Sequence, residues 1–177
     1  MPRGPRPHAD FVHVMNRGGG RRAVFTDDND RHAFLSMLGA ACQRFGVTVL
    51  AYCLLGNHYH LVFRRNDGDI SRTMQLLAGR YTAYFNRRHR TDGPLFRGRF
   101  KAVAIEDDTQ LIAAVAYVHA NIHDIGPHAD PRTHPWSSHP IYLGRAQAPE
   151  WFDTSPVLDL IAGPAALDRL VARSRAA

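Results

Sequence analysis

An apolar run, a tight turn and an alternating run follow one another near the middle of the chain, and together they constrain the fold most. Residues 47–55 are apolar and rich in β-branched side chains, which is typical of a buried strand. Gly56-Asn57 then indicates a turn, and residues 58–65 alternate between the two faces of a second strand. The three segments predict a β-hairpin whose second strand carries two histidines on one face.

The remaining periodicity supplies further strands and helices around this hairpin. Alternation predicts strands at residues 11–16 and 97–106. Apolar spacings of three and four, preceded by capping side chains, predict helices that begin at Asp28 or Asn29, at Asp69 or Ser71, and at Asp107. The order strand, helix, strand, strand, helix, strand, helix predicts an α+β fold, an antiparallel β-sheet with helices packed on it.

The composition changes after Gly126-Pro127, where six prolines follow at short intervals. We therefore expect one domain over residues 1–127 and a Pro-rich C-terminal tail over residues 128–177, in which residues 158–173 have the composition of a short terminal helix. No apolar run approaches the ~20 residues that span a bilayer. The N-terminal residues are not apolar, and two cysteines cannot build a disulfide framework. These features predict a cytoplasmic protein that does not bind membranes.

Basic residues are concentrated in one part of the chain. The formal net charge is +6, and residues 64–101 contain ten basic side chains against three acidic ones. A concentrated basic segment favours a polyanionic partner, nucleic acid above all, although a solvated basic face is the simpler alternative. Aromatic side chains lie among these arginines and are suited either to stacking on bases or to core packing: Tyr84, Phe85, Phe96 and Phe100.

Two pairs of residues have a spacing that places both side chains of the pair on one face of their predicted element. His58 and His60 are two apart on a strand, so both imidazoles leave the same face, as two ligands of one metal ion would. Tyr117 and Asn121 are four apart on a helix and share a face. Each pair alone also has an ordinary reading, because eleven histidines make such a pair frequent by chance and a helical tyrosine is often a core residue.

Taken in order, these residues and their neighbours resemble the HUH superfamily of single-tyrosine transposases, and within it the REP-associated tyrosine transposases, which are IS200-like. The resemblance covers roughly residues 10–140. It is carried by seven short stretches in register: Val14-Met15-Asn16-Arg17-Gly18, Ala51-Tyr52-Cys53-Leu54, Asn57-His58-Tyr59-His60-Leu61, Tyr84-Phe85-Asn86-Arg87-Arg88-His89, Leu95-Phe96-Arg97-Gly98-Arg99-Phe100-Lys101, Tyr117-Val118-His119-Ala120-Asn121 and Pro135-Trp136-Ser137-Ser138. Each stretch is modest alone, and all of them in order are specific.

The resemblance implies a ferredoxin-like or RRM-like HUH endonuclease fold, with residues 1–127 as the catalytic domain. It implies that Tyr117 is the nucleophile and that His58, His60 and Asn121 bind a divalent metal, Mg²⁺ or Mn²⁺. The implied activity is cleavage and rejoining of single-stranded or hairpin DNA with REP-like palindromes, through a 5′-phosphotyrosine and without a nucleotide cofactor. With the basic segment, it predicts these DNA-binding residues: Arg17, Arg72, Arg80, Arg87, Arg88, Arg97, Arg99 and Lys101.

The chain departs from the family pattern at two positions. Ile122 follows Asn121 where proline is usual, and Gly56 precedes the Asn57-His58 pair where proline is usual. Neither departure removes a group with a proposed chemical role. Two other readings remain open from the sequence: a metal-dependent nuclease that uses activated water, with Tyr117 structural, and a DNA- or RNA-binding module on the same fold without catalysis.

Overall fold

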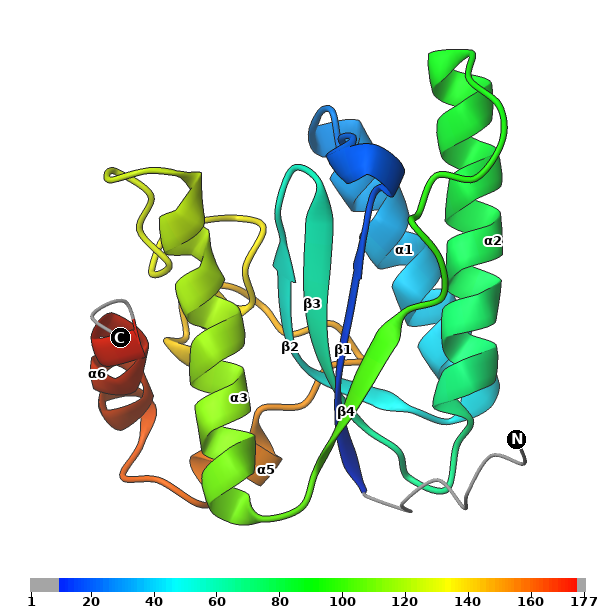
Figure 1. The fold of residues 1–177 in the computed structure, drawn as a ribbon. Coiled ribbons are helices and arrows are strands. Elements are labelled where there is room, and N and C mark those ends of the chain that lie inside the picture. Colours follow the sequence, from blue (N-terminus) through cyan, green and yellow to red (C-terminus); the bar gives the residue numbers. More distant parts are fainter. Residues whose placement is uncertain (1–9, 175–177) are drawn as a thin grey trace.

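The computed structural model describes residues 10–174, and the first nine residues of the predicted domain lie outside that range. Its centre is a four-stranded sheet in the order β2-β3-β1-β4, in which every pair of neighbours is antiparallel (Figure 1). The strands are β1 (Phe11–Arg17), β2 (Thr48–Leu54), β3 (His58–Arg64) and β4 (Lys101–Ile105). The predicted hairpin is β2-β3, and the βαββαβ order with this strand order is the predicted ferredoxin-like arrangement.

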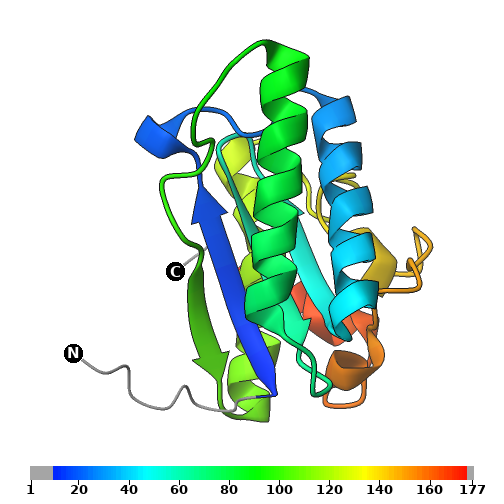
Figure 2. The same cartoon turned by 90° about the vertical axis from the view of Figure 1, so that its right-hand side faces the viewer.

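Helices cover both faces of the sheet. α1 (Asp28–Phe45) and α2 (Ile70–His89) lie side by side on one face, which is the near face in Figure 2. α3 (Asp108–Ala120) lies on the opposite face (Figure 1). Along β3, Tyr59, Leu61 and Phe63 are buried beneath α1 and α2, whereas the two histidines point toward α3. The alternation read from the sequence therefore divides the strand between a core face and a face that is available for a site.

Each of these helices begins at an aspartate that caps it. The side chains of Asp27, Asp69 and Asp107 accept hydrogen bonds from the backbone N–H three residues later, at distances of 3.1, 2.9 and 2.7 Å. Such caps satisfy N–H groups that have no partner within the helix. Gly46 ends α1 with a φ of 67°, a left-handed conformation that glycine adopts without strain. The helix starts predicted from capping residues are correct to within about one residue.

β4 is shorter than the strand predicted at residues 97–106. It pairs with β1 only as far as Met15, which faces Lys101. Before that point the amide of Asn16 donates from Nδ2 to the carbonyl of Gly98 at 3.1 Å, and the N–H of Arg97 donates to the carbonyl of Arg17 at 2.9 Å. A side chain thus takes the place of a ladder hydrogen bond, and the segment before Lys101 crosses the end of β1 as a loop instead of a strand.

The C-terminal part packs on the free edge of β2 and on α3. Ser138 N–H donates to the carbonyl of Tyr52, and Val49 N–H donates to the carbonyl of Trp151, both at 3.0 Å. The elements outside the βαββαβ core are η1 (Gly19–Arg21), η2 (Asn121–Ile125), α4 (His139–Tyr142), α5 (Ser155–Leu158) and α6 (Pro164–Ser174). α6 lies beside α3 (Figure 1) and buries Leu167 and Val171. Within residues 10–174, no helix has the length and apolarity that crossing a membrane requires.

Candidate active site

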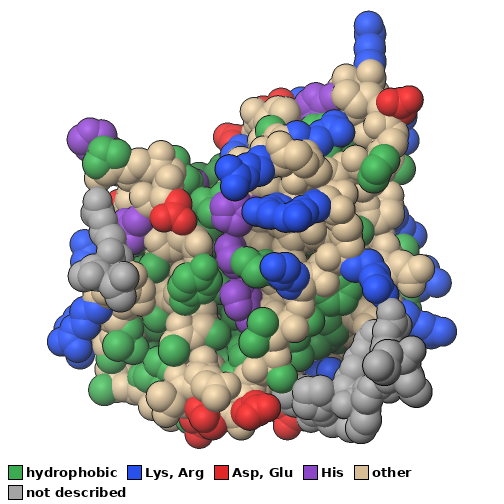
Figure 3. Space-filling model, in the orientation of Figure 1, with side chains coloured by type: hydrophobic (Ala, Val, Ile, Leu, Met, Phe, Trp, Pro, Cys, Tyr) green, Lys and Arg blue, Asp and Glu red, His purple; other side chains and the backbone are tan. Residues whose placement is uncertain are grey.

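Three histidines form a continuous group on the α3 face of the sheet. His58 and His60 project from β3, with ring centroids 5.3 Å apart. His13 projects from β1, and its ring is also 5.3 Å from that of His60. The strand register explains this contact, because Met15 is the direct partner of His60 and His13 is therefore its diagonal neighbour. Figure 3 shows the row of histidine side chains running down the centre of this face.

The hydrogen bonds of these rings leave the same nitrogen available on each of the two β3 histidines. His58 Nδ1 lies 2.6 Å from the side-chain oxygen of Asn57, and His60 Nδ1 lies 3.1 Å from His13 Nε2. Within the described part of the chain, no hydrogen bond reaches Nε2 of either His58 or His60. A histidine that ligates a metal typically uses one ring nitrogen for the metal and the other for such a partner.

Burial keeps these imidazoles neutral near pH 7. Burial, together with the positive charges that His13 and His58 would carry, lowers the pKa of His60 to about 3. Burial also lowers the pKa of His13 and of His58, although the carboxylate of Asp124 opposes the shift at His58. A neutral imidazole is the form that binds metal ions. The histidines of this face are therefore in the protonation state that a metal ligand needs.

Tyr117 and Asn121 complete this group from the other side of the site. The phenol ring of Tyr117 stands edge-on to His60, with the centroids 5.6 Å apart, and 48% of the residue is exposed to solvent. Asn121 is 7% exposed and donates from Nδ2 to the carbonyl of Tyr117 at 2.7 Å. That hydrogen bond engages the amide nitrogen, so the amide oxygen of Asn121 keeps its lone pairs for a cation.

The donor set that results is two imidazole nitrogens and one amide oxygen. Across residues 10–174 no three His, Cys, Asp or Glu side chains are grouped so that they could hold a metal ion. A site here therefore depends on Asn121 as its third ligand. Mn²⁺ accepts imidazole ligands more readily than Mg²⁺, which prefers oxygen ligands, and either ion can bind such a set. Three protein ligands leave open positions for oxygens of a substrate. The residues present fit a divalent metal of this kind.

These side chains open into a cavity of about 680 Å³ whose wall is strongly basic. It is lined by His58, His60, Tyr117 and Asn121, and by five cationic side chains: Arg17, Arg21, Arg97, Arg99 and Lys101. In Figure 3 the blue side chains border one side of the row of histidines. Asp124 is the one acidic residue in the lining. A cavity with this balance of charge attracts a phosphate backbone.

The structure brings together only half of the predicted DNA-binding residues. Four of them line the cavity and four lie on α2, which packs on the other face of the sheet: Arg72, Arg80, Arg87 and Arg88. Arg88 is held by two carboxylates, with its guanidinium 2.6 Å from Asp27 and 2.6 Å from the buried Asp30. The hydrogen bond to Arg88 lowers the pKa of Asp27 to about 2. The geometry thus assigns Arg88 a role in joining α2 to α1.

Three residues of the cavity region were not singled out by sequence reasoning. Arg21 is the last residue of η1, and Asp124 lies in η2 just beyond Asn121. The alternation of residues 11–16 is visible in the sequence, but it does not mark His13 as a site residue. Its proximity to His60 depends on β1 lying next to β3, which the sequence does not state. The aromatic side chains Phe85 and Phe96 are buried in the core, so they are not free to stack on bases.

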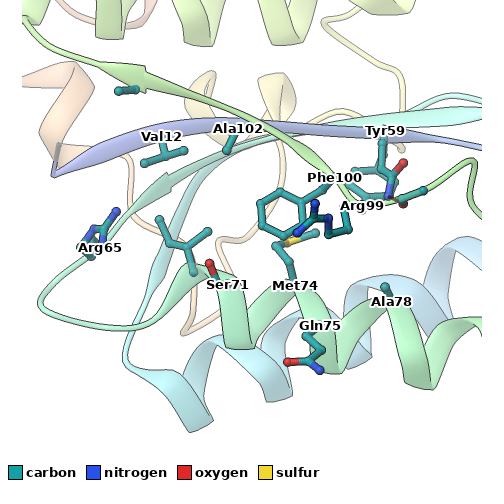
Figure 4. Close-up of a pocket in the computed structure, with 14 residues that line it drawn as sticks. Val12, Tyr59, Arg65, Ser71, Met74, Gln75, Ala78, Arg99, Phe100 and Ala102 are labelled. Carbon is teal, nitrogen blue, oxygen red and sulfur yellow. Dashed lines mark hydrogen bonds between the residues drawn. The ribbon is translucent and has the colours of Figure 1, made fainter. Parts of the chain in front are cut away.

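A larger cavity, of about 980 Å³, lies on the α2 side of the sheet (Figure 4). It runs between α2 and the β1-β4 pair, and its lining is mostly apolar, with Val12, Met74, Phe100 and Ala102 among the residues drawn. Arg99 borders both cavities. None of the histidines, Tyr117 or Asn121 reaches it, so the chemistry-bearing residues belong to the smaller, basic cavity alone.

Comparisons with known proteins identify a matching family model and solved structures of similar fold. The family model described as "Transposase IS200 like" matches residues 10–121. No curated protein matches the chain. Among solved structures, a REP-associated tyrosine transposase bound to a REP hairpin is 17% identical, with a TM-score of 0.65, over 92% of this chain and 97% of that one. A transposase structure from Deinococcus radiodurans is 14% identical, with a TM-score of 0.46, over 63% of this chain and 91% of that one.

Proposed function

The chain belongs to the IS200-like transposase family, and from that premise we propose that it cuts and rejoins single-stranded or hairpin DNA with Tyr117 as nucleophile. The observation that carries the proposal is the position of Tyr117. Its half-exposed ring stands 5.6 Å from that of His60 in a cavity whose wall holds five cationic side chains. One chain therefore contains the nucleophile, the candidate metal ligands and the phosphate-attracting wall.

The proposed reaction is a transesterification in which the number of phosphodiester bonds is conserved. The phenolic oxygen of Tyr117 attacks the scissile phosphorus, and its proton passes to solvent water, which returns one proton to the departing 3′-oxygen. The bond from phosphorus to the 3′-oxygen breaks, and that oxygen leaves as a 3′-hydroxyl after taking up a proton. The strand's 5′-phosphate is then esterified to Tyr117. Attack by a 3′-hydroxyl on this ester reverses the sequence and restores the phenol, so rejoining needs no nucleotide cofactor.

The side chains around Tyr117 have separate tasks in this scheme. His58, His60 and Asn121 would hold Mg²⁺ or Mn²⁺, which when bound supplies charge neutralisation at the scissile phosphate. Arg97, Arg99 and the other cations of the wall bind the flanking phosphates and hold the strand across the site. The hydrogen bond from Asn121 to the carbonyl of Tyr117 fixes the end of α3, so the nucleophile and the third ligand keep a constant separation.

We further propose that the substrate is a hairpin of the REP type and that residues up to 127 carry the catalysis. The solved relative of the same fold is bound to a REP hairpin. All the proposed site residues precede residue 127. Residues 128–174 pack on β2 and α3, where they support the helix that carries Tyr117. The proposed boundary therefore separates the segment that holds the site residues from the segment that supports α3.

The test is formation of a covalent adduct. We expect the wild-type protein, incubated with hairpin DNA and Mn²⁺, to give a protein–DNA band on a denaturing gel, with mass spectrometry locating the DNA on Tyr117. The variant Tyr117→Phe should lose adduct, cleavage and joining together while it still binds the hairpin. Tyr142→Phe is the matched control, because that hydroxyl donates to the carbonyl of Leu50 at 2.8 Å in the core and its loss should affect stability alone.

Three outcomes would contradict the proposal in different ways. If Tyr117→Phe still cuts DNA, water is the nucleophile and the protein is a metal-dependent nuclease. If the wild type binds hairpins tightly and never cuts them, with or without Mn²⁺, the protein is a binding module. If the adduct forms on another tyrosine, the assignment of Tyr117 is wrong and that of Asn121 falls with it.

A further inference from the structure

His13 touches both the proposed metal site and the proposed nucleophile. Its Nε2 lies 3.1 Å from His60 Nδ1, and the planes of the two rings are inclined by 26° to each other. Its ring centroid is 5.9 Å from that of Tyr117, in an edge-to-face arrangement. We propose that His13 is a positioning residue that accepts a hydrogen bond from His60 Nδ1 and so directs His60 Nε2 to the metal; this rests on the function proposed above.

The position of the proton on the His60 ring determines which of its nitrogens can bind a metal ion. A neutral imidazole carries one ring proton, and the nitrogen that binds a metal must be the one without it. If His60 binds through Nε2, its proton is on Nδ1, where it points at His13 Nε2. His13 Nε2 must then be the acceptor, and the proton of His13 must be on Nδ1. The 3.1 Å contact is therefore consistent with metal binding for only one pair of tautomers.

The neighbouring ligand has an equivalent partner of a different kind. His58 Nδ1 lies 2.6 Å from the side-chain oxygen of Asn57, which accepts its proton in the same way. Each proposed imidazole ligand thus has its own acceptor, an amide oxygen for His58 and a second imidazole for His60. Such outer partners set the orientation and tautomer of metal-binding histidines, and their loss typically weakens metal binding 10–100-fold.

The contact with Tyr117 extends the role of His13 beyond one ligand. His60 comes from β3 and Tyr117 from α3, and their relative position is set by how the helix packs on the sheet. His13, on β1, contacts both rings and lies diagonally across the strand pair from His60. A single side chain thereby fixes the orientation of a metal ligand and supports the ring that is to react beside it.

The experiment measures Mn²⁺ binding in the absence of DNA, by the electron paramagnetic resonance signal of free Mn²⁺. His13→Phe keeps an aromatic edge against Tyr117 and removes the acceptor. His13→Gln keeps an acceptor. We expect His13→Phe to weaken Mn²⁺ binding 10–100-fold, and His13→Gln to stay within about threefold of wild type. His32→Phe is the control, because His32 is an exposed histidine on α1 that contacts Trp136, and it should bind Mn²⁺ as wild type does.

A second measurement on the wild-type protein does not depend on any variant folding. With Zn²⁺ added as a diamagnetic probe, nitrogen chemical shifts of the ring atoms report each tautomer. We expect the proton on Nδ1 in both His60 and His13. A proton on Nε2 of His13 would overturn the proposal, as would equal Mn²⁺ affinity in His13→Phe and wild type, or an equal loss in the Phe and Gln variants.

Failure of this proposal is distinguishable from failure of the proposed function. If the wild type binds no Mn²⁺, the metal site itself is wrong and the role of His13 falls with it. If His60→Ala abolishes Mn²⁺ binding while His13→Phe leaves it unchanged, the metal site stands and only the role of His13 is overturned. Saturating Mn²⁺ should restore much of the cleavage rate of His13→Phe, because the reacting groups themselves are intact.

Discussion

The buried imidazole of His139 is 2.9 Å from Asp168, with Nε2 facing the carboxylate oxygen Oδ1. Its other nitrogen, Nδ1, lies 3.2 Å from Nδ1 of His119, the residue two positions after Tyr117 on α3. Asp168 belongs to α6 and is also paired with Arg132 at 3.1 Å. This chain of contacts connects the C-terminal segment to the helix that carries the proposed nucleophile, and it contains a titratable group in the core.

The first prediction is that stability falls when the pH drops below about 6.5. Burial lowers the pKa of His139, against the opposing effects of Asp168 and Asp130, while the charge of Arg132 adds to the lowering. In the unfolded chain this histidine takes up a proton below about pH 6.5, whereas the folded form does not until lower pH. The unfolded state therefore gains protons first, and each pH unit in that interval costs at most about 1.4 kcal/mol for this group.

The measurement is the thermal unfolding midpoint of wild type and His139→Gln between pH 7.5 and 5. We expect the midpoint of the wild type to fall more steeply than that of the variant below pH 6.5. Equal slopes would show that His139 has an ordinary pKa in the folded protein, and the pH dependence would then have to come from other buried histidines.

The second prediction concerns the metal ligands. Replacing both His58 and His60 by alanine should abolish Mn²⁺ binding and DNA cleavage, because two of three proposed ligands are lost. Hairpin affinity measured in EDTA should stay within about threefold of wild type, because the cationic wall is intact. The measurements are Mn²⁺ titration, single-turnover cleavage and a hairpin binding assay. Undiminished metal-dependent cleavage in the double variant would exclude these histidines as ligands.

The third prediction separates the arginines of the cavity from those of α2. Binding of single-stranded DNA should weaken with salt, with a slope in log K against log[salt] of roughly −0.7 for each phosphate contact. The double variant Arg97→Ala, Arg99→Ala should flatten the slope by about 1.4 if each arginine makes one contact. The matched control Arg72→Ala, Arg80→Ala removes two exposed arginines of α2. If the control flattens the slope and the cavity variant does not, the DNA follows α2.

The fourth prediction is that Arg88 matters for folding and hardly at all for DNA. Its removal leaves the buried carboxylate of Asp30 with Thr26 and His89 but without its closest cation, and the loss of one partner of a buried charge is destabilising. Arg88→Ala should lower the unfolding midpoint by several degrees and leave hairpin affinity unchanged at a temperature where it is folded. Arg87→Ala, at the exposed neighbouring position, is the control and should change neither. A stable Arg88→Ala variant with weakened DNA binding would reverse this assignment.

Local signals explain why much of the fold is predictable. The hairpin and the helix starts depend on alternation, on a turn and on capping aspartates within a few residues of each element. The length of β4 is not predictable in this way, because it depends on the amide of Asn16 reaching the carbonyl of Gly98 across the sheet. The packing of the C-terminal segment is equally hidden, since its prolines break any periodicity although Trp136, Tyr142 and Phe152 are core residues.

In the candidate site too, spacing within one element is predictable from the sequence, whereas contacts between distant elements are not. His58 and His60, and Tyr117 and Asn121, are pairs whose spacing within one element places them on one face, and both pairs face the cavity. Their chemical roles stay predictions. The arginines that line the cavity are determined by the strand ends and loops that meet there. Residue type and the density of basic residues along the chain therefore cannot distinguish Arg99, which lines the cavity, from Arg88, which pairs with Asp27 and Asp30. The proximity of His13 to the site follows only from the strand order, which places β1 next to β3.

That strand order also determines how much of the chain must be synthesised before the sheet and the candidate site can form. β1 is made first, yet it lies between β3 and β4, and both of its partners come later in the chain. It must remain unpaired on both edges until the hairpin emerges, and on one edge until Ile105 has been made. Contacts so distant in sequence form slowly. No growing chain that ends before Asn121 can contain the complete set of site residues, so a nascent chain can do no chemistry on DNA until the whole βαββαβ unit and α3 have been translated.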